Sequence, residues 1–116
     1  MRLAVVGASG RMGRAVVRIA HEAKMELVCA VASSEVGRDA GVLAGVGMLN
    51  VPIVWDLGAL EEARADVVID FSTAALVREV CTRAERAKTA IVSGTTGLDV
   101  KAVEALEEVS KSVPVL

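Results

Sequence analysis

The chain has 116 residues, of which 53% are hydrophobic and 24% charged, and its formal net charge is −2 at pH 7. This composition excludes a disordered chain, and the apolar runs are too short to cross a bilayer. The charge gives no basic field for nucleic acid, and the N-terminus lacks the cleavage site of a secretory signal. We therefore expect one domain over residues 1–116, a cytoplasmic location, and neither nucleic-acid nor membrane partners.

The first predicted element is a buried parallel strand over residues 3–6, which leads into a glycine-rich turn and then a helix over 11–24. The turn has the spacing GxxGxxG. Apolar residues at helical spacing predict the inward face of the helix, which consists of Met12, Val16, Ile19, Ala20 and Ala23.

Each glycine of this turn has a distinct role in a dinucleotide-binding site. Gly7 permits the sharp exit from the strand, Gly10 lets the backbone approach a pyrophosphate, and Gly13 allows the helix to pack closely on the sheet. The helix N-terminus adds unpaired N–H groups and a partial positive charge. We therefore predict a dinucleotide site, the alternative being a strand-turn-helix corner whose glycines serve packing alone.

Strands and helices alternate along the rest of the chain, which predicts an α/β fold with a doubly wound, mostly parallel sheet of about six strands. A loop with one helical turn is expected over 32–50. The other elements are expected as strands over 26–31, 51–54, 66–70, 90–93 and 113–116, and as helices over 73–87 and 98–112. In the helix over 73–87, the expected inward residues are Leu76, Val77, Val80, Cys81 and Ala84.

The two cysteines, Cys29 and Cys81, have neither the spacing of metal ligands nor a redox partner nearby. We expect both to be small buried side chains.

Ligands of open parallel sheets cross the carboxyl ends of the strands, so the residues that follow each strand are candidates for contact. After 26–31, an NAD-binding protein usually carries a carboxylate for the adenosine ribose, but this chain has Ala32, Ser33 and Ser34. Without that carboxylate we expect NADP to bind at least as well as NAD, with Ser33 as a contact. We expect Arg11 or Arg38 to supply the positive charge for the 2′-phosphate of NADP. The alternative is an ordinary serine turn, with Glu35 as a displaced ribose acceptor.

Phe71 is the only phenylalanine of the chain and follows the strand over 66–70. We interpret its ring as a contact for the cofactor near the nicotinamide, the alternative being a core residue beneath the sheet edge. Ser72 or Thr73 is expected to cap the next helix. Asp70 is expected to hold loop backbone through hydrogen bonds rather than to act as a base.

The turn Gly94-Thr95-Thr96-Gly97 follows the strand over 90–93 and offers backbone groups and hydroxyls that can meet a carboxamide. The alternative is a helix N-terminus capped by Thr96 or Asp99, with glycines that serve only the turn.

Four segments together resemble the dihydrodipicolinate reductase family of bacterial lysine and diaminopimelate biosynthesis. They are VGASGRMG at 6–13, DAG at 39–41 with LAG at 43–45, DFS at 70–72 and GTTG at 94–97. The resemblance covers essentially the whole chain.

The resemblance implies the nucleotide-binding domain of an oxidoreductase whose members use NADPH, NADH or both. In the complete enzyme it implies hydride transfer to a dihydropyridine dicarboxylate precursor. The residues implied to wrap the pyrophosphate are Gly7, Ala8, Ser9, Gly10, Arg11 and Met12. Those implied to approach the nicotinamide are Phe71, Gly94, Thr95 and Thr96.

The chain also departs from the family pattern. Ala32 and Ser33 replace an acidic residue or arginine, and Ala74 follows the DFST segment where proline is common. The family's substrate domain, with its HHxxK and SGT segments, is expected to be absent from this chain, so no catalytic residue or metal ligand is assigned. A stand-alone NAD(P)-sensing module and the nucleotide domain of another amino-acid dehydrogenase remain alternatives. If the absence of the substrate domain leaves part of the surface uncovered, we expect the chain to self-associate.

Overall fold

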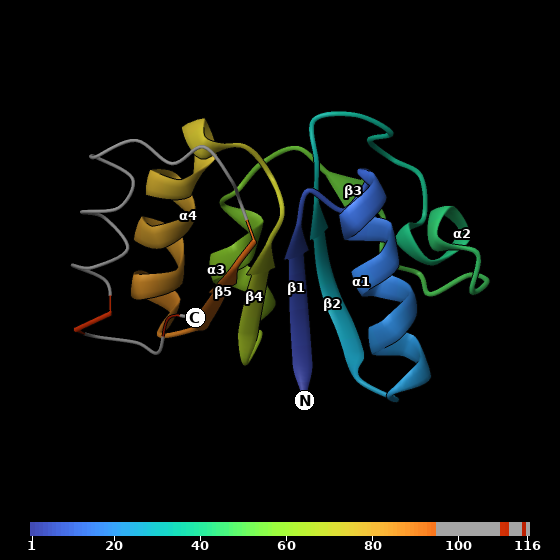
Figure 1. The fold of residues 1–116 in the computed structure, drawn as a ribbon, viewed down its shortest axis with the longest axis horizontal. Coiled ribbons are helices and arrows are strands. Elements are labelled where there is room, and N and C mark those ends of the chain that lie inside the picture. Colours follow the sequence, from blue (N-terminus) through green and yellow to red (C-terminus); the bar gives the residue numbers. More distant parts are fainter. Residues whose placement is uncertain (95–109, 112–114, 116) are drawn as a thin grey trace.

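One sheet of parallel strands organises the part of the chain that this computed structural model describes, residues 1–94, 110, 111 and 115. The strand order is β3-β2-β1-β4-β5 (Figure 1). The strands are β1 (Arg2–Val6), β2 (Glu26–Val31), β3 (Ile53–Val54), β4 (Val67–Asp70) and β5 (Ala90–Ser93). All of their pairings are parallel, which confirms the predicted fold class.

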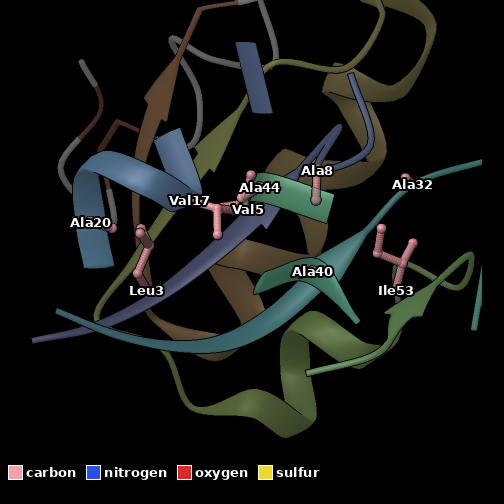
Figure 2. Packing of buried hydrophobic residues seen from close by; sticks show 10 residues of the cluster. Leu3, Val5, Ala8, Val17, Ala20, Ala32, Ala40, Ala44 and Ile53 are labelled. Carbon is pink, nitrogen blue, oxygen red and sulfur yellow. The ribbon is translucent and has the colours of Figure 1, made fainter. Parts of the chain in front are cut away.

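The helices form a layer on each face of the sheet. They are α1 (Arg11–Glu22), α2 (Ala40–Ala44), α3 (Ala59–Ala63) and α4 (Ala74–Ala87). Alternate residues of β1 point into two separate cores, as the period of two in a strand requires. Leu3 and Val5 pack with the α1 and α2 side, whereas Ala4 and Val6 pack with the α3 and α4 side. Figure 2 shows the first of these cores, where Val17 and Ala20 of α1 meet Leu3 and Val5.

Several predicted boundaries hold and others shift. β2 and β5 have the predicted bounds, α4 begins one residue late, and β3 is shorter than expected. The short helix α3 was not predicted, because its span is too brief to show a helical period. Of the predicted sixth strand, Val115 is described, and it forms a parallel bridge with Ile91 of β5. The helix predicted over 98–112 falls almost entirely outside the described residues.

The inward face predicted for α1 is correct only in part. Ala20 is buried and Val16 packs against the core, as predicted, but Met12 is 54% and Ile19 is 63% exposed, and Ala23 is exposed too. Gly13 and Val17 are buried instead. The helix is rotated because Gly13 must lie against the backbone of Gly7, where a side chain would overlap the Gly7 carbonyl oxygen. In α4, by contrast, the predicted inward face is confirmed: Val77, Val80, Cys81 and Ala84 are buried, and Leu76 is partly buried.

The segment between β2 and β3 is organised by Asp39. Its carboxylate caps α2 by accepting a hydrogen bond from the N–H of Val42 (3.1 Å). The same carboxylate accepts hydrogen bonds from the N–H groups of Leu49 (2.9 Å) and Val51 (2.8 Å). Partial burial raises the pKa of Asp39, but these backbone hydrogen bonds outweigh it and the net pKa is lowered. One side chain therefore ties the start of α2 to the residues that lead into β3.

An ion pair joins the two helices on the other face. Arg83 of α4 donates a hydrogen bond to Glu61 of α3 at 2.8 Å, and Arg86 lies 3.6 Å from the same carboxylate. The hydrogen bond from Arg83, with the charges of both arginines, lowers the pKa of Glu61. Within the described residues, no helix is long and apolar enough to cross a membrane.

Both cysteines are buried, as predicted. Burial raises the pKa of Cys29 to about 11, and burial together with the charges of Asp70 and Glu85 raises that of Cys81 to about 11. Because the thiolate is the reactive form, we expect neither thiol to react with Ellman's reagent at pH 8 until the protein is unfolded in denaturant. Rapid reaction of the folded protein would contradict this expectation.

Candidate functional site

The carboxyl ends of the five described strands lie in one row across the sheet. Pairing aligns Val54, Val31, Val6, Asp70 and Ser93, the last residues of β3, β2, β1, β4 and β5. The residues that follow them, in the order of the sheet, are Trp55, Ala32, Gly7, Phe71 and Gly94. The connections that leave this row therefore stand side by side at one edge of the sheet, where ligands of parallel sheets bind.

A cavity of about 660 Å³ opens at this edge, a size typical of small-molecule sites. It is lined from β1 and its turn, from the ends of β2 and β3, and from the connection into α4. The lining residues are Val6, Gly7, Ser9, Gly10, Val31, Ala32, Ser33, Trp55, Asp56, Leu57, Phe71, Ser72, Thr73, Leu76 and Glu79. Five of the predicted site residues are thus brought together: Gly7, Ser9, Gly10, Ser33 and Phe71.

The fold itself requires two of the three glycines in the turn. Gly7 has φ +85°, and a Cβ there would lie 2.7 Å from the carbonyl oxygen of Phe71. A Cβ on Gly13 would overlap the Gly7 carbonyl. Gly10 differs, because it has φ −77° and a Cβ added there would lie 3.4 Å from its nearest neighbour, an ordinary contact. Packing within the described protein therefore does not explain why position 10 lacks a side chain.

The N-terminus of α1 lies at the middle of the row, directly after the glycine turn that follows β1. Gly10 is its N-cap residue, and no side chain caps it. The first turn contains no acidic residue, so the partial positive charge of the helix is not offset there. The N–H groups of a first helical turn have no partner within the helix and can bind an anion. A phosphate in front of Gly10 fits this arrangement.

The other residues predicted to wrap the pyrophosphate lie beside the cavity rather than in its lining. Ala8 is buried, and its N–H donates to the carbonyl of Val31 at 3.2 Å. Arg11 and Met12 occupy the exposed first turn of α1. Gly7 also donates its N–H to Val31, at 2.8 Å, so two hydrogen bonds hold the turn against the end of β2.

Hydroxyl groups join the glycine turn to the connection after β2. The hydroxyls of Ser9 and Ser34 are 2.8 Å apart, and Ser33 lines the cavity. Arg38, one of the predicted sources of positive charge, pairs with Glu35 at 2.9 Å. That pairing offsets the charge of Arg38 and engages Glu35, the alternative ribose acceptor.

Buried Asp70 shapes the connection after β4, as expected of a residue that holds loop backbone. Its carboxylate accepts hydrogen bonds from the N–H (2.9 Å) and hydroxyl (2.5 Å) of Ser72. The prediction that Ser72 or Thr73 caps α4 is confirmed for the position and wrong for the side chain. Thr73 is the N-cap residue but makes no side-chain hydrogen bond to the helix, and the Ser72 hydroxyl donates to Asp70.

Gly94 touches the ring of Phe71, since a Cβ on Gly94 would overlap the ring carbons. The Gly94 N–H also donates to the carbonyl of Asp70 at 2.9 Å, which joins the connections after β4 and β5. Thr95 and Thr96 lie outside the described residues. Phe71 is partly buried and lines the cavity, so its ring is available to a ligand.

Sequence reasoning missed the residues that follow β3. Trp55 and Asp56 line the cavity, and the Trp55 side chain is 74% exposed. The signal was present, because Trp55 is the only tryptophan and stands directly after a predicted strand. Leu76 and Glu79 of α4 also line the cavity. The part of the chain that the structure describes holds no cluster of three metal-ligating side chains.

Comparison with known proteins identifies related sequences. The family described as "Dihydrodipicolinate reductase, N-terminus" matches residues 1–116. The 4-hydroxy-tetrahydrodipicolinate reductase of Archaeoglobus fulgidus is 43% identical over 116 residues, which are 100% of this chain and 44% of that protein. The enzyme of the same name from Acinetobacter baumannii (strain AYE) is 40% identical over 118 residues, covering 99% of this chain and 43% of that protein. The chain thus spans less than half the length of these relatives.

Comparison with solved structures supports the fold. The WlbA (WbpB) dehydrogenase of Thermus thermophilus, in complex with NAD and UDP-GlcNAcA, superposes with a TM-score of 0.73. The two proteins are 17% identical, over 99% of this chain and 40% of that one. The amine dehydrogenase of Mycobacterium smegmatis gives a TM-score of 0.71 at 20% identity, over 94% of this chain and 37% of that one. The doubly wound α/β architecture is therefore shared with these two dehydrogenases.

Proposed function

This chain belongs to the dihydrodipicolinate reductase family and matches its N-terminal domain, and from that membership we propose that residues 1–116 form one domain that binds NADPH or NADH. Because the chain belongs to this family, we set aside the alternative that it is the nucleotide domain of another amino-acid dehydrogenase. The dinucleotide supplies a hydride when bound. The complete protein would transfer it to a dihydropyridine dicarboxylate precursor in lysine and diaminopimelate biosynthesis. A cytoplasmic location remains a prediction.

Gly10 is the observation that carries this proposal. It lines the cavity and precedes the uncapped N-terminus of α1, yet the surrounding protein would tolerate a Cβ there. A bound pyrophosphate explains the missing side chain, because a phosphate that accepts hydrogen bonds from the first helical turn must approach the Gly10 backbone closely. In this arrangement Gly7 to Met12 surround the pyrophosphate, and Phe71 with Gly94 to Thr96 lies toward the nicotinamide.

We propose that NADPH binds at least as tightly as NADH. The end of β2 presents Ala32 and Ser33 instead of the carboxylate that would bind a ribose 2′-hydroxyl and repel a 2′-phosphate. Ser33 supplies a hydroxyl donor in the cavity, and the bond between Ser9 and Ser34 holds the neighbouring backbone. Calorimetric titration of the chain with each nucleotide compares the two dissociation constants directly.

Gly10→Ala tests the site. We expect the added methyl group to push the pyrophosphate away from the helix N-terminus. Loss of a charge-assisted hydrogen bond of about 1.5–3 kcal/mol corresponds to an increase in the Kd for NADPH of about 10- to 150-fold. Because φ at Gly10 is ordinary, the free energy of unfolding should fall by no more than about 1 kcal/mol, the scale of an N-cap change. Calorimetry and urea denaturation measure the two quantities.

The matched control is Gly47→Ala. Gly47 has φ +93°, does not line the cavity, and has open space where a Cβ would lie. This variant should lose about 1 kcal/mol of stability through backbone strain and keep the wild-type Kd. Wild-type protein that binds neither nucleotide would refute the proposed function, and unchanged binding by Gly10→Ala would refute the assigned place of the pyrophosphate.

A further inference from the structure

Trp55 is the largest exposed apolar side chain at the cavity. It follows β3 directly, lines the cavity and is 74% exposed. Leu57, two residues further along the chain, is 5% exposed and also lines the cavity, so Trp55 and Leu57 form an apolar part of the wall at this end. Water contact over an indole ring is unfavourable, and a flat ligand would relieve it.

The order of the strand ends indicates which half of a bound dinucleotide lies beside Trp55. The glycine turn after β1 is central, with β2 and β3 on one side and β4 and β5 on the other. With the pyrophosphate at Gly10, the two nucleosides extend in opposite directions along the row. The adenosine ribose belongs at the end of β2, beside Ser33. The base attached to that ribose then lies one strand further out, which is where Trp55 stands.

Phe71 and Gly94 occupy the opposite half of the row, after β4 and β5. The chain therefore has one aromatic side chain on each side of the pyrophosphate site. Neighbouring strands are about 4.8 Å apart, so the distance between β3 and β4 across three strand intervals suits an extended dinucleotide rather than a single base.

We propose that Trp55 is the stacking platform for the adenine of the bound dinucleotide, and so a specificity-determining residue for purine nucleotides. This inference rests on the proposed function and deepens it. Stacking tolerates any flat π-system but requires an open aromatic face, which the exposure of Trp55 provides. Asp56 is held beside it, since its carboxylate accepts a hydrogen bond from the Gly58 N–H at 2.8 Å.

Tryptophan fluorescence reports on this contact directly, because the chain has one tryptophan and no tyrosine. We expect ADP-ribose and 5′-AMP to change the emission of the wild-type chain, excited selectively at the indole, in a saturable way. Nicotinamide mononucleotide, which lacks adenine, should leave the emission unchanged.

Variants separate stacking from mere proximity. Trp55→Ala should weaken ADP-ribose and NADPH by about 5- to 150-fold in calorimetry, the range for loss of one stacked base. Trp55→Phe keeps an aromatic face and should recover most of the affinity. The control is Ile19→Ala, which removes a side chain that is 63% exposed on α1 and does not line the cavity. Circular dichroism checks that each variant is folded.

Two results would overturn the inference and leave the proposed function intact. One is calorimetric binding of NADPH with the same Kd in the wild type and Trp55→Ala. The other is an emission change caused by nicotinamide mononucleotide and not by 5′-AMP, which would place the nicotinamide half at β3. If the wild type binds no dinucleotide at all, the proposed function fails and this inference fails with it.

Discussion

Gly13→Ala is expected to lower the free energy of unfolding by about 3 kcal/mol, the upper end of the range for overpacked interiors. A Cβ at this position would overlap the backbone carbonyl of Gly7, and no side-chain rotation can relieve a clash with backbone. Within a helix the same change normally stabilises by about 1 kcal/mol, so the expected sign is opposite to helix propensity. Urea denaturation followed by far-UV circular dichroism measures the loss.

Gly10→Ala serves as the control for this prediction, because it lies in the same turn and its Cβ would make only an ordinary contact. It should retain nearly all of the wild-type stability. If Gly13→Ala were as stable as the wild type, the close approach of α1 to the turn after β1 would be incorrect, and so would the rotation of α1 that exposes Met12 and Ile19.

Asp39→Ala is expected to lower the free energy of unfolding by about 2–3 kcal/mol, since it leaves three backbone N–H groups without their charged acceptor. Those groups belong to Val42, in the first turn of α2, and to Leu49 and Val51, which lead into β3. Asp39→Asn keeps one acceptor oxygen and should lose about half as much. Glu35→Gln is the matched control, because it breaks only an exposed ion pair with Arg38 and should change stability by less than about 1 kcal/mol.

The same carboxylate predicts a pH dependence. Folding lowers the pKa of Asp39 below its ordinary value of 3.8. Its ionised form therefore contributes stability at pH values above 3.8, and this contribution disappears as the pH falls through the lower pKa of the folded state. The stability difference between wild type and Asp39→Asn should shrink between pH 7 and about pH 2.5. A difference that stays constant over this interval would contradict the role given to the carboxylate.

Short apolar runs alternate along the chain with segments of helical periodicity, and this was enough to predict a parallel α/β sheet. A strand that is buried on both faces has a nearly continuous apolar run. The spacing of Gly7, Gly10 and Gly13 predicted the turn and its ligand class. Asp70 was correctly expected to hold loop backbone, since a short carboxylate at a strand end is within reach of the following N–H groups.

The orientation of α1 was not predictable in the same way. Apolar residues surround enough of this helix to define two adjacent stripes, and only the contact between Gly13 and Gly7 selects the one that is buried. The cap of α4 was not predictable either, because two local partners compete for the Ser72 hydroxyl, and it bonds to Asp70 instead of the helix end.

Residue patterns alone thus determined the class of fold, the glycine turn and the family resemblance, because each of these depends on neighbours along the chain. The tertiary structure decided which residues meet at the cavity, because that depends on the order and register of strands far apart in sequence. Parallel pairing sets Val54, Val31, Val6, Asp70 and Ser93 level with one another. Only that alignment brings Trp55 to the same edge as Gly10 and Phe71.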